Sequence, residues 1–371
     1  MDDPETATSL LETFLRLSLI EGFSADHLRR LRTEGAEAGL PGMRSPARRA
    51  LFARAEAALS SPDAAGKTEK IRERCARDRI EILTYGSPGY PAALRAIPGS
   101  PLILYRAGRA FPETPAVAIV GSRAPTGPGK GFARQLSGDL AAAGWTVVSG
   151  MARGIDAAAH EGALRAGGVT VAVLGCGVDV VYPPEHGRLR AQILEAGAIL
   201  SEYPPGSIPM QHRFPARNRI VSGICQGVVV AEAPERSGAL ITARVALEQG
   251  REVLSVPGSP WFAHTAGSNR LLREGATPAC SAADVMEALG GTEPRGLPAL
   301  ARRILEILSG ERHAARISEA LGLPLPEVLS CLAEMEVANL VEKRAGDYYK
   351  RKSERPGSTP GVSPEGAWPG R

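Results

Sequence analysis

This sequence lacks any uninterrupted apolar run long enough to cross a bilayer, although hydrophobic residues make up 43% of its 371 positions. Its first residues, 1–9, are acidic rather than a basic signal leader. We therefore expect a cytoplasmic protein that makes no membrane contact. The length is sufficient for more than one domain and for a sizeable core.

Cysteine is also scarce, and the five cysteines include no C-x-x-C pair. Scattered cysteines argue against a zinc site and against a disulfide framework. We interpret all five as reduced residues of the core, namely Cys75, Cys176, Cys225, Cys280 and Cys331.

Lysine is the rarer basic residue, because 38 of the 44 cationic residues are arginine. The net charge of +4 is too small to indicate a polyanionic partner. Arginine has a planar fork that suits phosphate and stacks on bases. A compositional bias toward Ala, Gly, Pro and Arg explains most of these residues, so only their placement indicates function.

Two nucleotide-binding motifs are absent as well. The chain contains no Walker loop, and the glycines after its first strong apolar run do not match G-x-G-x-x-G. This absence disfavours a nicotinamide-dependent dehydrogenase.

What the sequence does contain is a regular alternation of apolar runs and helical patterns from Val117 onward. Nearly continuous Val, Ile, Leu and Ala predict strands that are buried on both faces. The pattern is typical of an α/β fold with an open, mostly parallel sheet, in which ligands bind beyond the carboxyl ends of the strands. The expected strands cover 117–121, 146–150, 169–175, 198–202, 228–232 and 253–257, and the first two are followed by expected helices at 129–143 and 155–166.

The flanking regions are predicted to be separate parts. Residues 1–70 show helical spacing with breaks near Gly22 and Pro41, and 60–68 reads as a loop or linker. Strands at 80–85 and 102–105, with a short helix from Tyr90-Pro91, are expected to pack on the edge of a main domain at 78–290.

After a turn-rich linker at 290–298, helical patterns at 300–308, 315–321 and 327–340 precede a possible hairpin at 341–349 with Gly346 in its turn. Three helices and a hairpin predict a winged-helix-like domain at 298–350. The Pro-, Gly- and Ser-rich tail at 351–371 is expected to be disordered.

Four segments at the expected carboxyl edge carry candidate binding residues. Gly121-Ser122-Arg123 by itself fits a plain turn, whereas Arg153 has no structural explanation between small residues. Asp156 and His160 share a helical face and fit an acid–base pair, but a helix-start aspartate above a hydrogen-bonded core histidine is the favoured interpretation.

The densest segment is QHRFPARNRI at 211–220. Arginines that alternate with an aromatic ring suit a single-stranded nucleic acid, and a solvated helix start with Phe214 in the core is an equal alternative. Ser237 opens a further helix, where its hydroxyl fits either a phosphate ligand or a helix cap.

Long stretches of this sequence resemble the DNA-processing protein A family (DprA, also called Smf). They are GSR at 121, SGMARGIDAAAH at 149, GCGVDVVYP at 175, SEYPPG at 201, FPARNRI at 214 and EAPERSGALITARVALEQGREVLSVPG at 232. The order and spacing are kept over about 80–289. The chain departs from the family at Pro128-Gly129, where a tyrosine-glycine pair is usual, and residues 1–70 lack the G-x-G turn of a helix-hairpin-helix.

The resemblance implies an extended Rossmann-like, doubly wound domain that binds single-stranded DNA, forms a homodimer and helps to load the RecA recombinase during natural transformation. SSB is a further candidate partner, and neither a cofactor nor catalytic residues are implied. By the same resemblance, the DNA pocket comprises Gly121, Ser122, Arg123, Gly150, Arg153, Gly154, Asp156, Phe214, Arg217, Asn218, Arg219, Ser237 and Thr242, with arginines on phosphates and Phe214 facing a base.

Two alternatives stay open. The family's fold is similar to that of nucleoside-monophosphate phosphoribohydrolases, but the stretch ERSGALITARVALE lacks the second glycine and the catalytic glutamate of their P-G-G-x-G-T-x-x-E motif. A regulator that binds duplex DNA would use the winged helix, whose last helix carries Glu327, Glu334 and Glu336 and little positive charge. That acidity favours a protein contact instead.

Overall fold

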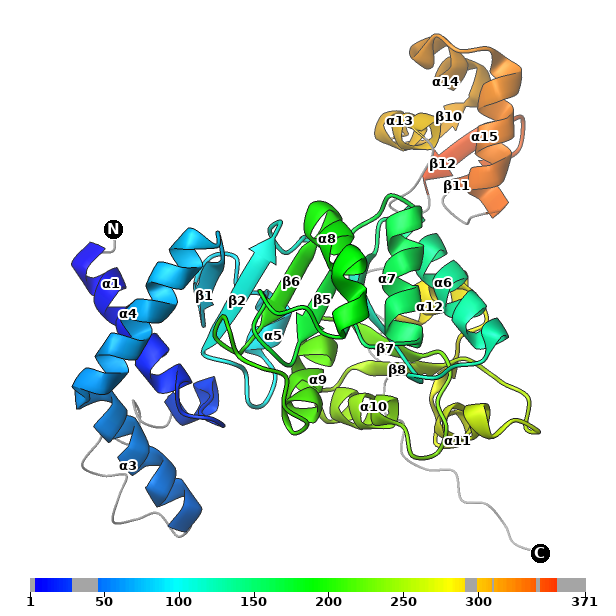
Figure 1. Cartoon of the computed structure of the whole chain (residues 1–371). Coiled ribbons are helices and arrows are strands. Elements are labelled where there is room, and N and C mark those ends of the chain that lie inside the picture. Colours follow the sequence, from blue (N-terminus) through cyan, green and yellow to red (C-terminus); the bar gives the residue numbers. More distant parts are fainter. Residues whose placement is uncertain (1–3, 29–45, 291–298, 309, 338–340, 352–371) are drawn as a thin grey trace, which may run out of the picture. The chain divides into compact units, whose positions relative to one another are not determined.

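The computed structural model describes residues 4–28, 46–290, 299–308, 310–337 and 341–351 (Figure 1). The chain divides into two compact units, Met1–Pro294 and Arg295–Arg371. The expected break near Pro41, most of the expected linker at 290–298 and the tail beyond residue 351 lie outside the described residues.

The first unit is built on a sheet with strand order β1-β2-β6-β5-β4-β3-β7-β8-β9. Neighbours from β6 to β9 are parallel, whereas β2 pairs antiparallel with both β6 and β1. Each expected strand overlaps an observed one, which confirms the extended Rossmann-like, mostly parallel sheet; the pattern does not predict β9. The strands are β1 Glu81–Thr84, β2 Ile103–Gly108, β3 Ala116–Val120, β4 Thr146–Ser149, β5 Thr170–Leu174, β6 Ala198–Ser201, β7 Gly227–Val230, β8 Glu252–Ser255 and β9 Thr277–Pro278.

Helices cover both faces of this sheet. Successive residues of a strand point to opposite sides, so alternate residues contact different helices. Val117 and Ile119 of β3 pack with α6 and α7, whereas Ala118 and Val120 pack with α9 and α10. The helices of this region are α5 Ala92–Arg95, α6 Gly127–Ala142, α7 Ile155–Arg165, α8 Gly187–Ala196, α9 Arg213–Gly223, α10 Gly238–Glu248, α11 Ala266–Arg273 and α12 Ala282–Ala288, with 3-10 turns at Pro184–His186 and Ala263–Thr265.

The order of the strands places a topological switch point at β3. The chain runs from β3 through β4, β5 and β6 on one side and then returns to β7 on the other side of β3. In open α/β sheets ligands bind in the crevice outside such a point. A binding site is therefore expected at the loops that follow β3 and β7.

The amino-terminal helices belong to the same compact unit as the sheet. They are α1 Pro4–Ser18, α3 Pro46–Ser60 and α4 Pro62–Arg77. Phe14 and Leu15 of α1 share a core with Tyr105 of β2. The prediction of a loop or linker at 60–68 is wrong, because Ser61 caps α4 by accepting a hydrogen bond from the backbone N–H of Ala64. A small polar segment that contains an N-cap and Pro62 starts a helix as readily as it makes a loop.

Four of the five cysteines are buried, as expected, but Cys280 is exposed. The prediction that Cys280 is a core residue is therefore wrong. Cys280 follows β9, and its backbone N–H donates to Asp284 in the capping box that begins α12. The helix start fixes the backbone there and leaves the side chain in solvent.

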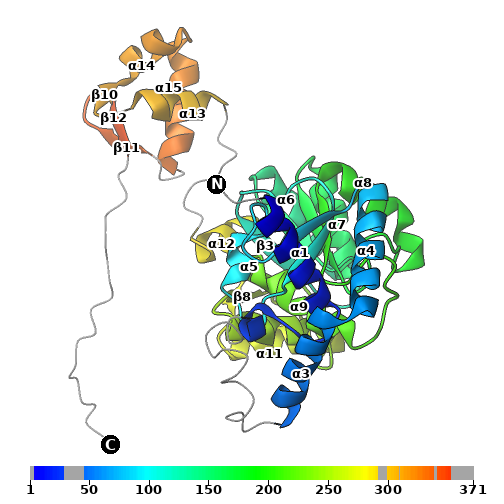
Figure 2. The same cartoon turned by 90° about the vertical axis from the view of Figure 1, so that its left-hand side faces the viewer.

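The second unit is a winged helix, as the sequence predicts (Figure 2). Ile304, Ile317 and Leu332, one from each helix, form the centre of its core. Gly346 has φ +75° in the hairpin turn, as expected. The elements are α13 Ala299–Ile307, β10 Arg312–His313, α14 Ala314–Leu321, α15 Leu325–Val337, β11 Val341–Arg344 and β12 Tyr348–Arg351.

Within the described residues, every helix is either too short or too polar to span a bilayer.

The contact between α6 and α7 gives a test of the packing. A Cβ at Gly162 of α7 would overlap the backbone of Arg134 and the hydroxyl of Ser137 on α6, whereas a Cβ at Gly131 of α6 would meet open space. We expect Gly162→Ala to lower the free energy of unfolding by about 1–3 kcal/mol through overpacking. Gly131→Ala is the matched control and should raise it by about 0.5–1 kcal/mol. Urea unfolding followed by circular dichroism measures both, and a Gly162→Ala midpoint at or above that of the unsubstituted chain would contradict the packing.

Candidate functional site

A cleft of about 650 Å³ opens at the carboxyl edge of the sheet, over the switch point. Its walls are the loops after β3, β4, β5 and β7 and the starts of α9 and α10. The cleft brings together ten of the thirteen predicted site residues: Gly121, Ser122, Arg123, Gly150, Asp156, Phe214, Arg217, Asn218, Ser237 and Thr242.

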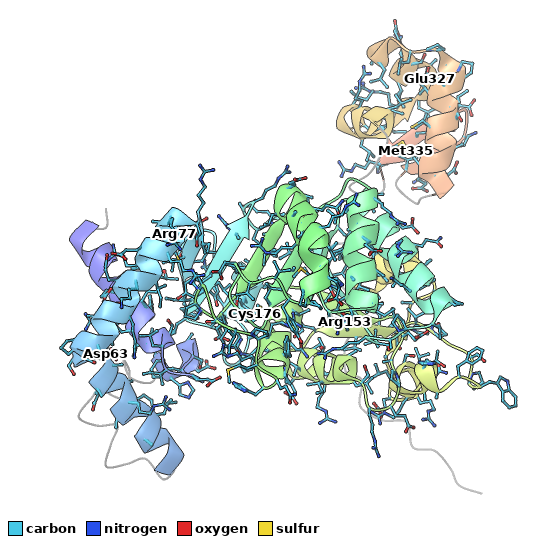
Figure 3. All side chains as sticks on the ribbon, viewed as in Figure 1. Asp63, Arg77, Arg153, Cys176, Glu327 and Met335 are labelled. Carbon is cyan, nitrogen blue, oxygen red and sulfur yellow. The ribbon has the colours of Figure 1, made fainter. Side chains whose placement is uncertain are left out.

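The other three predicted residues lie outside this cleft. Arg153, labelled in Figure 3, lines a small adjoining cavity, and its exposed guanidinium pairs with Glu185. Gly154 caps the start of α7. Arg219 pairs with Glu202 at 2.6 Å. Arg217 and Arg219 diverge because residues two positions apart on a helix point to different faces.

An aromatic pair with a cation beside it lines the cleft. The rings of Phe214 and Tyr182 have centroids 5.4 Å apart, and the guanidinium carbon of Arg123 lies 5.7 Å from the centroid of the Phe214 ring. Phe214 is half-buried and Arg123 is exposed, so Phe214 is not simply a core residue. A cation over an aromatic ring is attracted by the ring quadrupole and is held near it.

Arg217, in contrast, is buried in the floor of the cleft, with 5% of its surface exposed. Its guanidinium donates to the carbonyl of Gly150 at the end of β4, at 2.9 Å, and to that of Val173 in β5. Its Nε donates to the side chain of Asn218. A Cβ at Gly150 would overlap this guanidinium, so a larger residue there would displace the Arg217 side chain. Burial lowers the pKa of Arg217, and the nearby Asp156 opposes this change.

Asp156 holds the same loop from the other side. Its carboxylate accepts from the backbone N–H of Gly150 at 3.1 Å and of Ala152 at 3.4 Å. Complete burial raises the pKa of Asp156, while Arg217 and the two N–H donors act in the opposite direction. The favoured sequence interpretation of Asp156 as a structural residue at a helix start is thus supported.

A second buried carboxylate organises the start of α6. Glu232 follows β7 and is 3% exposed. It accepts from the backbone N–H of Thr126 at 2.8 Å and from the Thr126 hydroxyl at 2.5 Å, and that hydroxyl in turn caps α6 through Gly129. The position at which a Rossmann-like fold usually receives an external phosphate is occupied by the chain's own carboxylate.

The start of α10 is capped by a hydroxyl, and its first turn carries no acidic side chain. Ser237 accepts from the N–H of Ala239 at 3.2 Å, which confirms the helix-cap interpretation of its hydroxyl. Gly238 and Arg236 beside it are exposed and line the cleft. A helix N-terminus next to an exposed arginine favours an anion.

Sequence reasoning missed several residues that the structure places here. Tyr182 stacks on Phe214, and Arg236 and Gln211 line the cleft. The tyrosine lies within the GCGVDVVYP run, and Arg236 directly precedes Ser237, so both stood next to recognised motifs. Glu232 is the first residue of a recognised stretch, but its role could not be predicted because its partner Thr126 is 106 positions away. Among the described residues, no group of three His, Cys, Asp or Glu side chains is placed to hold a metal ion.

His160 lies beneath the site and is fully buried in α7. Its Nδ1 is 2.7 Å from the Thr170 hydroxyl, which itself donates to the carbonyl of Val147, so Nδ1 carries the proton. The second ring nitrogen, Nε2, is buried without a hydrogen-bond partner. Burial lowers the pKa of His160 to about 3.

Comparisons with known proteins agree with this fold. The profile of the family described as "DNA recombination-mediator protein A" matches residues 81–290, and that of the "DprA winged helix domain" matches 282–347. Protein Smf of Synechocystis is 46% identical over 215 residues, which span 57% of this chain and about half, 54%, of that relative.

Two solved structures are also similar. The X-ray structure of DNA processing protein A from Streptococcus pneumoniae is 34% identical, has a TM-score of 0.61 and covers 76% of this chain and 96% of that one. The DNA processing protein A of Helicobacter pylori, whose structure describes a single-stranded DNA binding mode, is 29% identical, has a TM-score of 0.52 and covers 57% of this chain and 96% of that one.

The buried histidine predicts a pH dependence of stability. The folded-state pKa of His160 lies below its unfolded value of about 6.5, so protonation favours the unfolded chain. The contribution of neutral His160 to the free energy of unfolding is complete above pH ~6.5. It is lost as the pH falls toward about 3, at up to ~1.4 kcal/mol per pH unit. We expect the free energy of unfolding to fall less steeply between pH 7 and 5 in His160→Gln, measured by urea unfolding. Equal slopes in the two proteins would show that the histidine is not buried in its neutral form.

Proposed function

Because this chain belongs to the DNA recombination-mediator protein A family, also called DprA or Smf, we propose that it binds single-stranded DNA in the cleft and acts as a recombination mediator. The observation that carries the proposal is the grouping of Arg123, Phe214 and Tyr182 at the carboxyl edge of the sheet. The binding that is described for the Helicobacter relative supports it.

The cleft offers each component of an unpaired nucleotide a different contact. The exposed guanidinium of Arg123 takes a phosphate, and the Phe214–Tyr182 pair stacks on a base. Arg236 and the N–H groups at the start of α10 take a further phosphate. Stacking and phosphate contacts tolerate any base, so the binding is independent of sequence.

Arg217 contributes to this binding by fixing the floor of the cleft rather than by holding a phosphate. Its guanidinium is engaged with two backbone carbonyls and is almost completely buried. Removing it leaves buried carbonyls unpaired and Asp156 uncompensated, which costs several kcal/mol in comparable buried pairs. Arg217→Ala is therefore a poor probe of DNA contact, because it changes stability and binding together.

The wider role in the proposal is to protect incoming single strands and to load RecA on them during natural transformation, with SSB as a further partner and a homodimer as the working form. The winged helix is assigned a protein contact rather than the major groove of duplex DNA. Its α15 exposes Glu327, labelled in Figure 3, and Glu336, which would repel a phosphate backbone. A preference for duplex over single strands in a gel shift would overturn this assignment.

The enzymatic alternative makes a clear prediction. A nucleoside-monophosphate phosphoribohydrolase must receive a phosphate at its helix termini, whereas here Glu232 binds the N-cap residue of α6 and Asp156 binds the loop that leads into α7. We expect incubation with AMP to release no adenine by chromatography. We also expect AMP not to raise the unfolding temperature, because a ligand that does not bind the folded state cannot stabilise it. Adenine release above a no-protein control would favour hydrolysis.

Arg123 gives the most selective test of the DNA contact. It is exposed, and the structure describes its guanidinium against Phe214 rather than in an ion pair. We expect Arg123→Ala to weaken binding to oligo-dT and to flatten the slope of log affinity against log salt by about 0.7 for each lost phosphate contact. Fluorescence anisotropy across a salt series measures both quantities.

Arg165 provides the matched control. It is an exposed arginine in the last turn of α7, at the opposite edge of the sheet. Arg165→Ala removes the same charge and should leave the slope unchanged, apart from a small long-range effect. Equal losses of affinity for oligo-dT in the two variants would mean that only net charge matters. That result would contradict DNA binding in the cleft.

A further inference from the structure

The loop after β8, residues 257–265, exposes two adjacent aromatic rings. Trp261 is 90% exposed and Phe262 is 58% exposed, in a chain with only 5% aromatic residues. Trp145, by comparison, is 3% exposed. Neighbouring large rings that are left in water mark a contact surface.

This loop is held by hydrogen bonds within itself and to α11. The Thr265 hydroxyl donates to the carbonyl of Ser259 at 2.6 Å. The Asn269 side chain accepts from the N–H of Gly258 at 3.0 Å and donates to its carbonyl at 2.9 Å. The two rings are therefore presented on a fixed turn, which limits the ordering cost of binding.

The same loop is tied to the wall of the cleft. The N–H groups of Gly267 and Ser268, in the first turn of α11, donate to the carbonyl of Ala233 at 2.8 and 3.1 Å. Ala233 directly precedes Pro234, which lines the cleft. The position of the aromatic turn relative to the cleft is thus set by the fold of one compact unit.

The order of the strands arranges the binding groups in a row. Going along the carboxyl edge through β5, β4, β3, β7 and β8, the loop after each strand carries in turn Tyr182, Arg153, Arg123, Arg236 and Trp261. Strands lie about 4.8 Å apart, so this row extends over about 20 Å. In Figure 1 the β8 strand lies beside β7, and the chain from β8 to α11 is drawn in yellow-green to yellow.

The chemistry of the loop suits bases better than a second protein surface. From 257 to 274 the charged or titratable residues are His264, Arg270, Arg273 and Glu274, and Arg270 pairs with Glu274 at 3.3 Å. Two rings bury at most about 500 Å², whereas a stable protein interface needs about 800 Å² on each partner. Aromatic rings among basic groups are typical of single-strand binding.

We propose that Trp261 and Phe262 form a second stacking platform, on which bases of the DNA strand pack as it leaves the cleft across β7 and β8. This inference rests on the proposed function, because it extends the track that begins at Phe214. We expect only longer strands to contact this platform, because a short oligonucleotide fills the cleft without reaching β8.

The test compares oligo-dT of about 5 and about 15 nucleotides by fluorescence anisotropy with the full chain. We expect the double substitution Trp261→Ala and Phe262→Ala to weaken binding of the longer strand by about 5- to 100-fold and to leave the shorter one unchanged. Trp261→Phe should keep most of the affinity, because it keeps a ring. Leu247→Ala, at a 60% exposed residue near the other end of α10, is the control for loss of exposed apolar surface and should change neither affinity.

Three outcomes would overturn the inference. If the double variant binds both lengths normally while Arg123→Ala weakens both, the platform is refuted and the cleft remains. If the unsubstituted chain binds neither length, the proposed function fails and the platform fails with it. If the double variant binds the longer strand normally but sediments as a smaller species than the unsubstituted chain, the rings contact a second copy instead.

Discussion

The buried guanidinium of Arg217 is the interaction on which the site depends. Three segments that are distant in the sequence meet at this one group: the carboxyl ends of β4 and β5 and the first turns of α9. Asp156 accepts from the N–H of Gly150 while Arg217 donates to its carbonyl, so this one residue is held at both its donor and its acceptor. With the floor fixed in this way, Arg123 and the Phe214–Tyr182 pair are left at the surface of the cleft.

Two of the chain's own carboxylates occupy backbone donors at the carboxyl edge of the sheet. Glu232 binds the N-cap residue of α6, and Asp156 binds N–H groups of the loop before α7, where a small phosphate ligand would otherwise be held. Two exposed cations, Arg123 and Arg236, line the cleft along this edge. Contacts that are spread along an edge suit a polymer with regularly repeated phosphates.

The sequence predicted the sheet well, because strands follow from local patterns, and ten of the candidate residues that it offered line one cleft. Continuous apolar runs from Val117 onward marked the strands, and the loops that follow them carried the candidate residues. Roles that depend on packing between distant segments could not be predicted from the sequence. Arg217 and Arg219 are alike in the sequence, yet one is buried in the cleft floor and the other pairs with Glu202 outside it. Cys280 looked like a core residue until its place beside a helix cap was known.

In the proposed binding mode, an unpaired strand lies across the carboxyl edge of the sheet with its bases on the rings of the cleft. Photocrosslinking of an oligo-dT that carries 5-iododeoxyuridine, followed by mass spectrometry of the joined peptide, tests this most directly. The account predicts crosslinks to Phe214 or Tyr182, which face each other in the cleft. Crosslinks confined to the winged helix, for example to Tyr348 at the start of β12, would contradict it.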